Sequence, residues 1–197
     1  MKKLALFAII FLGIAAAFYF LFKPRLIVTR VEDLQPTGVQ PSEESDQEVV
    51  RMQITSSSFN KADNIPEKYT CDGDNVNPAL SISDVPEEAK SLVLIMDDPD
   101  APAGTWNHWL IFNIDPKTKE ISEDSVPDGA NLGTNDFGKL EYGGPCPPIG
   151  VHRYYFRLYA LDNTLELAKG AKRADIEKAM QGHVLNNVEL MGKYQKK

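Results

Sequence analysis

Four segments of the chain carry the hydrophobic pattern of β-strands. Residues 52–55 alternate apolar and polar side chains, as a half-buried strand does. Residues 91–96, which are all apolar after Ser91, and residues 109–112 form short apolar runs, which indicates strands packed on both faces. Residues 154–161 are rich in aromatic side chains, which suit a packed sheet. We therefore expect a mainly β domain that begins at residue 52.

The last segment of the chain has a different pattern. Apolar side chains recur there at the spacing of a helix, namely Ile176, Ala179, Met180, Val184, Val188 and Met191. Asp175 stands where it can cap the start of a helix. Gly182 lies in the middle of the segment, so we expect a break or a bend there. The pattern predicts a C-terminal helix after the β-rich part.

The chain begins with a strongly hydrophobic segment. An uncharged run of 19 residues, from Leu4 to Phe22, follows Lys2 and Lys3. As a helix this run would be about 28 Å long, close to the thickness of the hydrocarbon core of a bilayer. We expect residues 1–25 to form a membrane anchor. The alternative is a signal peptide that is cleaved after the small residues at positions 15–17.

Residues 26–51 have the composition of an acidic linker. Six acidic residues, two prolines and one glycine lie between positions 31 and 50, and there is little apolar periodicity. Such a segment is extended and solvated. We therefore expect a single-pass membrane protein whose domain, residues 52–197, lies outside the cytoplasm. If the N-terminal segment is cleaved, the same domain is secreted instead.

The charge of the chain narrows the choice of ligands. The net charge is −7, from 21 basic and 28 acidic residues. The first 51 residues carry six of each, so the whole excess falls on residues 52–197. An acidic domain has no general attraction for nucleic acid, which we exclude as a partner. An anionic ligand would need a local pocket.

Polar residues occupy the ends of two predicted strands. Asp98, Asp100 and Pro102 follow the strand at 91–96, and His108 precedes the strand at 109–112. Each has an ordinary structural explanation, because aspartates beside prolines often bind turn amides and histidines often only pack. Loops beyond strand ends are nevertheless where binding residues concentrate on a rigid scaffold.

A second polar group precedes the strand at 154–161. His152 and Tyr154 follow a glycine- and proline-rich turn that contains Gly144. Glycine-turn amides that converge with an imidazole and a phenol make an anion-binding concavity. Taken together, the two groups predict a small anion pocket in which the aspartates orient the histidines.

Other kinds of chemistry find less support. The chain has no Gly-x-Ser-x-Gly elbow and no metal-binding spacing, so we expect no metal and no other cofactor. Cys71 and Cys146 are the only cysteines. An even number behind a membrane anchor favours a disulfide that would join two loops, while two free thiols or a cysteine nucleophile remain open.

These motifs resemble those of the phosphatidylethanolamine-binding protein family, which includes the Raf kinase inhibitor proteins. The resemblance extends from about Met52 to Tyr194 and rests on Asp98-Pro99-Asp100-Ala101-Pro102, His108-Trp109, Gly144-Pro145 and His152-Arg153-Tyr154. Details such as Tyr69-Thr70-Cys71-Asp72-Gly73 look like the prokaryotic, Raf kinase inhibitor-like branch.

The resemblance implies a large antiparallel sheet packed on a smaller sheet, with a C-terminal helix near the pocket. It implies a pocket for phosphate-type head groups, with the ligand-binding residues Asp98, Asp100, Pro102, His108, Gly144, His152 and Tyr154. By position, Trp106 would stand at the pocket mouth and Tyr194 nearby. A cis peptide bond before Pro99 or Pro102 would suit the family. The anchor and linker lie outside the family module, and Asn107 stands where some relatives have a second histidine.

The sequence therefore favours a membrane-tethered binding module over an enzyme. We expect a small anionic or phosphorylated ligand, bound by charge-assisted hydrogen bonds from His108, Tyr154 and backbone amides near Gly144. Regulation of a protein partner, such as a kinase or a protease, is a variant of this function. The competing hypothesis is a hydrolase that uses His108 or His152 as acid or base, with Asp98 as the orienting group.

Overall fold

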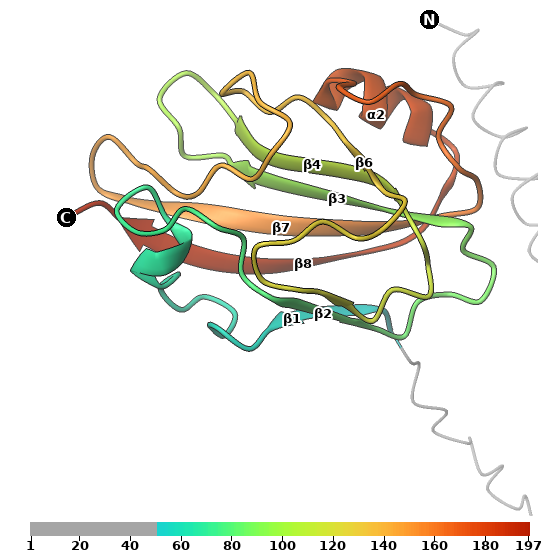
Figure 1. Cartoon of the computed structure of the whole chain (residues 1–197), viewed down its shortest axis with the longest axis horizontal. Helices are drawn as coiled ribbons and strands as arrows, with labels where there is room; N and C mark the ends of the chain where they lie inside the picture. The colour runs from blue at the N-terminus through green and yellow to red at the C-terminus, as the bar shows by residue number, and fades with distance from the viewer. Residues whose placement is uncertain (1–50) are drawn as a thin grey trace, which may run out of the picture. The chain divides into compact units, whose positions relative to one another are not determined.

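The computed structural model describes residues 51–197, which fold into two antiparallel sheets and an α-helix (Figure 1). The elements in chain order are β1 (Gln53–Ser56), the 3-10 helix η1 (Glu67–Tyr69), β2 (Leu80–Ser83), β3 (Ser91–Asp98), β4 (Trp106–Ile114), β5 (Glu120–Ile121), β6 (Asn131–Leu132), β7 (Val151–Leu161), α2 (Arg173–Met180) and β8 (Val184–Gln195). The mainly β prediction, with a large and a small sheet, is confirmed.

The large sheet has the strand order β6-β4-β3-β7-β8. Its central strand, β3, is buried along its whole length, which explains why residues 91–96 are apolar on both faces. The long pairing of β7 with β8 runs from Val151, opposite Gln195, to Leu161, opposite Val184. Because β4 and β7 flank β3 and both pair with it antiparallel, the end of β3 meets the starts of β4 and β7 at one edge of the sheet.

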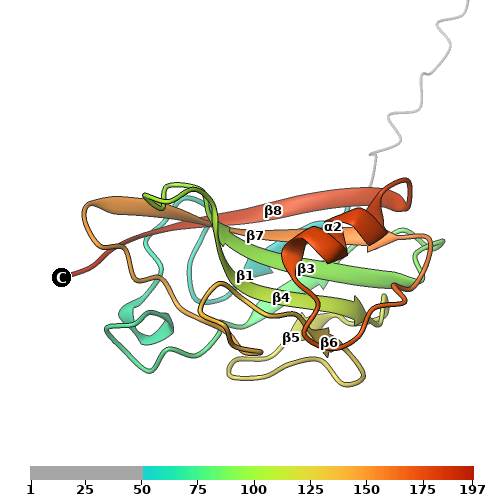
Figure 2. The ribbon, with the colours of Figure 1, turned by 90° about the horizontal axis from the view of Figure 1, so that it is seen from above.

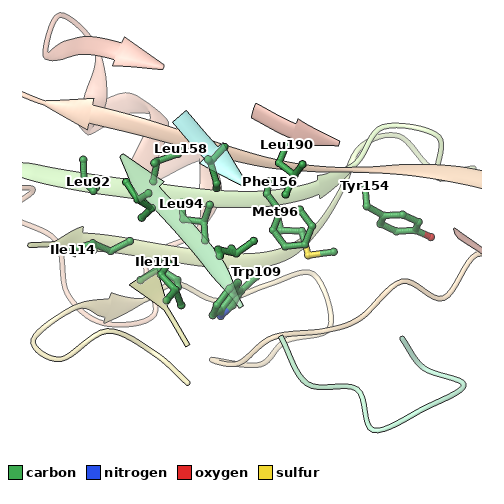
Figure 3. Packing of buried hydrophobic residues seen from close by; sticks show 14 of the residues in the cluster. Leu92, Leu94, Met96, Trp109, Ile111, Ile114, Tyr154, Phe156, Leu158 and Leu190 are labelled. Atoms are coloured by element: carbon green, nitrogen blue, oxygen red, sulfur yellow. The ribbon is translucent and has the colours of Figure 1, made fainter. Parts of the chain in front are cut away.

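One face of the large sheet packs on the small sheet, which has the order β1-β2-β5. Side chains from both sheets form the main hydrophobic core, including Leu94, Met96, Trp109, Phe156 and Leu190 (Figure 3). Strands β1 and β2 alternate buried and exposed residues, as strands with one buried face should. The core therefore lies between the two sheets.

The other face of the large sheet is covered in part by α2, which lies beside β3 and β4 (Figure 2). Ile176 and Met180 of the helix pack there with Val93 and Leu110 of the sheet. Asp175 accepts a hydrogen bond from the Lys172 backbone N–H at 3.2 Å, so it helps to cap the helix from its third position. The helix is thus present, but it is not the last element.

The prediction that the helical pattern continues beyond Gly182 is wrong. Gly182 has a φ of +80°, a left-handed conformation that suits glycine after the end of a helix. The chain then forms β8, in which Leu190, Gly192 and Tyr194 are buried in alternation. Apolar residues four apart satisfy both a helical and a two-residue period, and pairing with β7 decides between them here.

Three further predictions concern the N-terminal part and the backbone. The anchor at residues 1–25, and the linker at 26–51 except for Arg51, lie outside the described residues. Between residues 51 and 197 no helix combines the length and the apolar character needed to cross a bilayer. In that same range every peptide bond is trans, so the expected cis bond before Pro99 or Pro102 is not present.

Candidate functional site

A buried carboxylate–histidine pair lies where β3 ends and β7 begins. The Nδ1 of His152 lies 2.7 Å from the Oδ2 of Asp98, and the two side chains are only 7% and 5% exposed. The other oxygen of Asp98 accepts a hydrogen bond from the Asp100 backbone N–H at 2.8 Å. The Asp98 carboxylate therefore holds the His152 ring and also closes the turn that follows β3.

A β-bulge brings His108 onto the same face as this pair. Met96 of β3 stands opposite Trp109, and the next residue, Asp97, stands opposite Asn107, so His108 is an extra residue without a partner in β3. The bulge places His108 next to the core residue Tyr154, with ring centroids 5.2 Å apart. Without the bulge, strict alternation from Trp109 would have put His108 on the opposite face.

On the opposite face of the sheet, polar contacts connect the bulged region to α2. Arg173 at the start of α2 donates to the Oδ2 of Asp97 and to the Oδ1 of Asn107, each at 2.8 Å. Asp97 is also paired with Arg157 at 3.0 Å. Asn107 therefore stabilises the strand ends behind the site, and it does not provide a second polar group beside His108.

His108 is held in one orientation by the turn before β7. Its Nδ1 lies 2.6 Å from the carbonyl oxygen of Gly143, which can only accept, so the Nδ1 carries the proton. Burial lowers the pKa of His108, and this effect exceeds the opposing effects of the Gly143 carbonyl and the Asp98 charge. Neutral His108 therefore keeps a free lone pair on Nε2.

Tyr154 supplies a buried phenol beside His108. The residue is fully buried, and its hydroxyl makes no hydrogen bond of good geometry within the described range, although the Asp98 carboxylate and the Cys146 backbone lie close to it. Burial, followed by the nearby Asp98 charge, raises the pKa of Tyr154 above its usual range. The phenol thus stays protonated and is an available donor, at a substantial desolvation cost while it is unpaired.

The amides of the glycine turn are engaged within the protein. The Gly143 N–H donates to the carbonyl oxygen of His108 at 3.1 Å, and the Gly144 N–H donates to the Oδ1 of Asn75 at 2.8 Å. The prediction that the amides near Gly144 point at a ligand is therefore wrong for these two groups. Gly144 is needed for packing, because a Cβ there would lie 2.5 Å from the carbonyl oxygen of Tyr69.

Asp100 and Pro102 lie apart from the buried group. Both carboxylate oxygens of Asp100 accept hydrogen bonds from Arg153, at 2.6 and 2.8 Å from the guanidinium. This pairing lowers the pKa of Asp100 to about 2. Pro102 is exposed in the loop between β3 and β4. The structure thus brings together Asp98, His108, His152 and Tyr154, with Gly144 behind them, while Asp100 and Pro102 shape the loops.

Phe137 and Asn75 belong to the surroundings of the site, and sequence reasoning missed both. The Phe137 ring packs edge-on against His108 and Trp106, with centroids 5.4 Å away in each case. A cavity of about 150 Å³ is lined by Phe137 and Asn75 together with Gly143 and Gly144. No local sequence signal distinguishes these residues from ordinary loop positions.

Cys71 and Cys146 are placed at disulfide distance, as predicted, with 5.4 Å between their Cα atoms. The Cys71 N–H also donates to the carbonyl oxygen of Pro145 at 3.1 Å. The pair therefore joins the loop after η1 to the turn that holds Gly143 against His108. The Tyr194 hydroxyl, at the end of β8, donates a hydrogen bond to the Oδ2 of Asp72 in the first of these loops, at 2.6 Å.

The donor set of the site does not resemble a metal centre. Among residues 51–197, no group of three or more histidine, cysteine, aspartate or glutamate side chains is arranged to hold a metal ion. The Nδ1 atoms of both histidines are already engaged, and only their Nε2 atoms have no partner among the described residues. The chemistry available is hydrogen bonding by two imidazoles and a phenol.

Most of the described part of the chain is similar to known proteins of one family. A family model described as phosphatidylethanolamine-binding protein matches residues 55–195. A UPF0098 protein of Methanothermobacter thermautotrophicus is 52% identical over 150 residues, which cover 74% of this chain and 99% of that protein. A UPF0098 protein of Aquifex aeolicus is 47% identical over 152 residues, 74% of this chain and 89% of that protein.

Solved structures show the same relationship. The crystal structure of a phosphatidylethanolamine-binding protein homologue from Chlamydia trachomatis is similar, with a TM-score of 0.73 and 44% identity, covering 75% of this chain and 99% of that one. The structure of YbcL from E. coli, described as a member of the mammalian PEBP family, has a TM-score of 0.70 and 29% identity, again covering 75% and 99%.

Proposed function

This chain belongs to the phosphatidylethanolamine-binding protein family, and we propose that it is a binding module that captures a phosphate group, either free or in a phosphorylated head group. The ligand would occupy the space bounded by His108, His152 and Tyr154. An arrangement of two histidines and a phenol on a rigid sheet edge supports binding without a covalent step. The protein would bind this ligand without catalysing a reaction on it.

The observation that carries the proposal is the Tyr154 hydroxyl. It is buried and protonated, and in the described part of the chain it has only the nearby Asp98 carboxylate and Cys146 backbone beside it, neither at good hydrogen-bond geometry. A buried donor without a partner is costly, and an oxyanion would supply the missing acceptor. The Nε2 atoms of His108 and His152 likewise have no partner among residues 51–197. No hydroxyl or thiol nucleophile is hydrogen-bonded to either imidazole within residues 51–197.

Anion binding is coupled to protonation of the His108 side chain. Its Nε2 is an acceptor when the ring is neutral, so it can donate to a fully ionised oxyanion only after it takes up a proton. Burial lowers the pKa of His108 in the free protein, and a bound anion would raise it again. Anion binding should therefore take up protons and should weaken as the pH rises.

Titration calorimetry of the full-length protein tests this proposal. We expect phosphate and phosphoethanolamine to bind. Sulfate keeps a constant charge across this pH range, and it should bind more tightly at about pH 5.5 than at about pH 8. Its affinity should change by up to about tenfold per pH unit in the pH interval between the pKa of His108 in the free protein and its pKa in the complex. His108→Gln should remove most of this pH dependence, and Tyr154→Phe should weaken binding at least about tenfold with the fold intact.

The same variants separate binding from catalysis. A panel of phosphate-ester and carboxylate-ester substrates should show no turnover by the native protein. Turnover that is lost in His108→Gln would instead support the hydrolase hypothesis. Sulfate binding with unchanged affinity and pH dependence in both variants would place the anion elsewhere and contradict the proposed site.

We also propose that residues 1–25 anchor the domain to a membrane and that residues 26–51 act as a spacer, on the strength of the hydrophobic and acidic composition alone. A phosphorylated side chain of a kinase or protease partner could then supply the phosphate group. Cell fractionation should recover the chain in the membrane fraction with its N-terminus retained. A soluble form whose N-terminus lies near Phe18 would show that the segment is cleaved.

A further inference from the structure

A second cavity, of about 320 Å³, is lined by residues of β4, of β6 and of three loops, and by none of the histidines. Its wall includes Trp109 of β4, Tyr142, and the loops at residues 75–77 and 124–126. Asp124, Ser125 and Glu141 are exposed, so they form its mouth, whereas Trp109 is only 1% exposed and lies at its inner end. None of the four residues that form the buried group of the phosphate site lines this cavity.

The indole N–H of Trp109 is a buried donor in the wall of this cavity. The Nε1 atom is buried and has no hydrogen-bond partner within residues 51–197. Figure 3 shows this nitrogen on the side of the ring that faces away from the other labelled core side chains. The Tyr142 ring packs edge-on against the indole, with centroids 5.5 Å apart, and so fixes its orientation. An indole nitrogen only donates, so the group that completes this site must carry an acceptor atom.

Two other residues of the wall have an unusual backbone. Asn75 and Asp124 are in the left-handed region, with φ of +58° and +51°. Asn75 uses its side-chain oxygen for the Gly144 N–H, while its amide nitrogen has no partner in the described residues. The Asp124 carboxylate likewise has no partner there. Asn and Asp are the non-glycine residues that adopt this conformation most readily, and here it leaves polar side-chain atoms of both residues free to bind a ligand.

The charges at the mouth select the ligand. Asp124 and Glu141 are both acidic, and Lys139 compensates only Glu141, at 2.8 Å. A phosphate or carboxylate ligand would be repelled here, and an ammonium group would be attracted. Val76, Val126 and Leu132 provide an apolar wall between the mouth and the indole. The cavity thus offers a carboxylate, an apolar surface and a buried donor.

We propose that this cavity binds a small organic cation of the amino acid amide class. The ammonium group would lie against Asp124, the carbonyl oxygen would accept from the Trp109 indole N–H, and an aliphatic side chain would contact the three apolar residues. This site is independent of the phosphate pocket in ligand charge and in binding residues. Its test can therefore fail while the proposed function stands, and the reverse is also true.

Nuclear magnetic resonance of the full-length protein tests the proposal with L-leucinamide as the probe. The chain has two tryptophans, so Trp106→Phe assigns the two indole N–H signals. At about pH 6.5, where an α-amino group is charged, leucinamide should move the Trp109 signal downfield in a saturable way. Isopentylamine lacks the carbonyl group and N-acetyl-leucinamide lacks the charge, so each should bind at least about threefold more weakly.

Matched variants complete the test. Asp124→Asn keeps a residue that tolerates the left-handed backbone, and it should weaken leucinamide at least about threefold without affecting sulfate. Asp128→Asn, a nearby exposed control, should leave both ligands unchanged. A Trp109 signal that does not move, that moves equally with all three compounds, or that responds identically in Asp124→Asn would overturn the proposal.

Discussion

Asp98→Ala should lower the free energy of unfolding by about 3 to 5 kcal/mol, which is a large part of the stability of a domain of this size. The substitution removes the carboxylate from a pair that is almost completely buried and leaves the Nδ1 of His152 without its partner. It also removes the acceptor for the Asp100 backbone N–H in the turn after β3. Urea unfolding followed by circular dichroism measures the change.

Asp100→Ala is the matched control, because Asp100 lies two residues away and its carboxylate is paired with Arg153. Its side chain is 27% exposed and that of Arg153 is 48% exposed, so solvent screens the pair. We expect a loss of about 1 kcal/mol or less, despite the short contacts. Equal losses in the two variants would show that burial of the Asp98–His152 pair does not govern the stability of this edge.

Replacement of both cysteines by serine should lower the free energy of unfolding by about 2 to 4 kcal/mol. The bond between Cys71 and Cys146 closes a loop across a sequence separation of 75 residues, so it restricts the unfolded chain strongly. It also joins the two loops that hold Gly143 and Gly144 in place. The variant should therefore bind sulfate more weakly than the native protein, as measured by the same calorimetric titration.

A reducing agent provides the control for this prediction. It should destabilise the native protein to the level of the double serine variant, and it should have no effect on the variant itself. Thiol labelling of the unreduced, denatured protein should detect no free cysteine. Labelling of both cysteines, or equal stability with and without the reducing agent, would show that no disulfide is present in the isolated protein.

The core of the fold could be predicted from the sequence because the strands are strongly patterned. The continuous apolar run at residues 91–96 became the central strand β3, and the aromatic segment at 154–161 became most of β7. The final segment was misassigned because its four-residue spacing fits two periods. Long-range pairing with β7, which local pattern does not contain, makes it β8.

The chemical types in the site were predictable, but their geometry was not. Asp98 and His152 are 54 residues apart and meet through the antiparallel register of β3 with β7. His108 reaches them only because of a bulge, and nothing in residues 106–109 distinguishes a bulged strand from a regular one. The role of Gly144 was also misjudged, since the glycine accommodates the Tyr69 carbonyl and its amide is engaged by Asn75.

The central claim is that a small oxyanion binds to the side chains of His108, His152 and Tyr154. A crystal structure of the full-length protein grown with selenate, whose selenium atom is located by anomalous scattering, tests it most directly. We predict one ordered anion within hydrogen-bond distance of the Tyr154 hydroxyl and of the Nε2 of His108. A structure at saturating selenate in which this position holds no selenium would contradict the account.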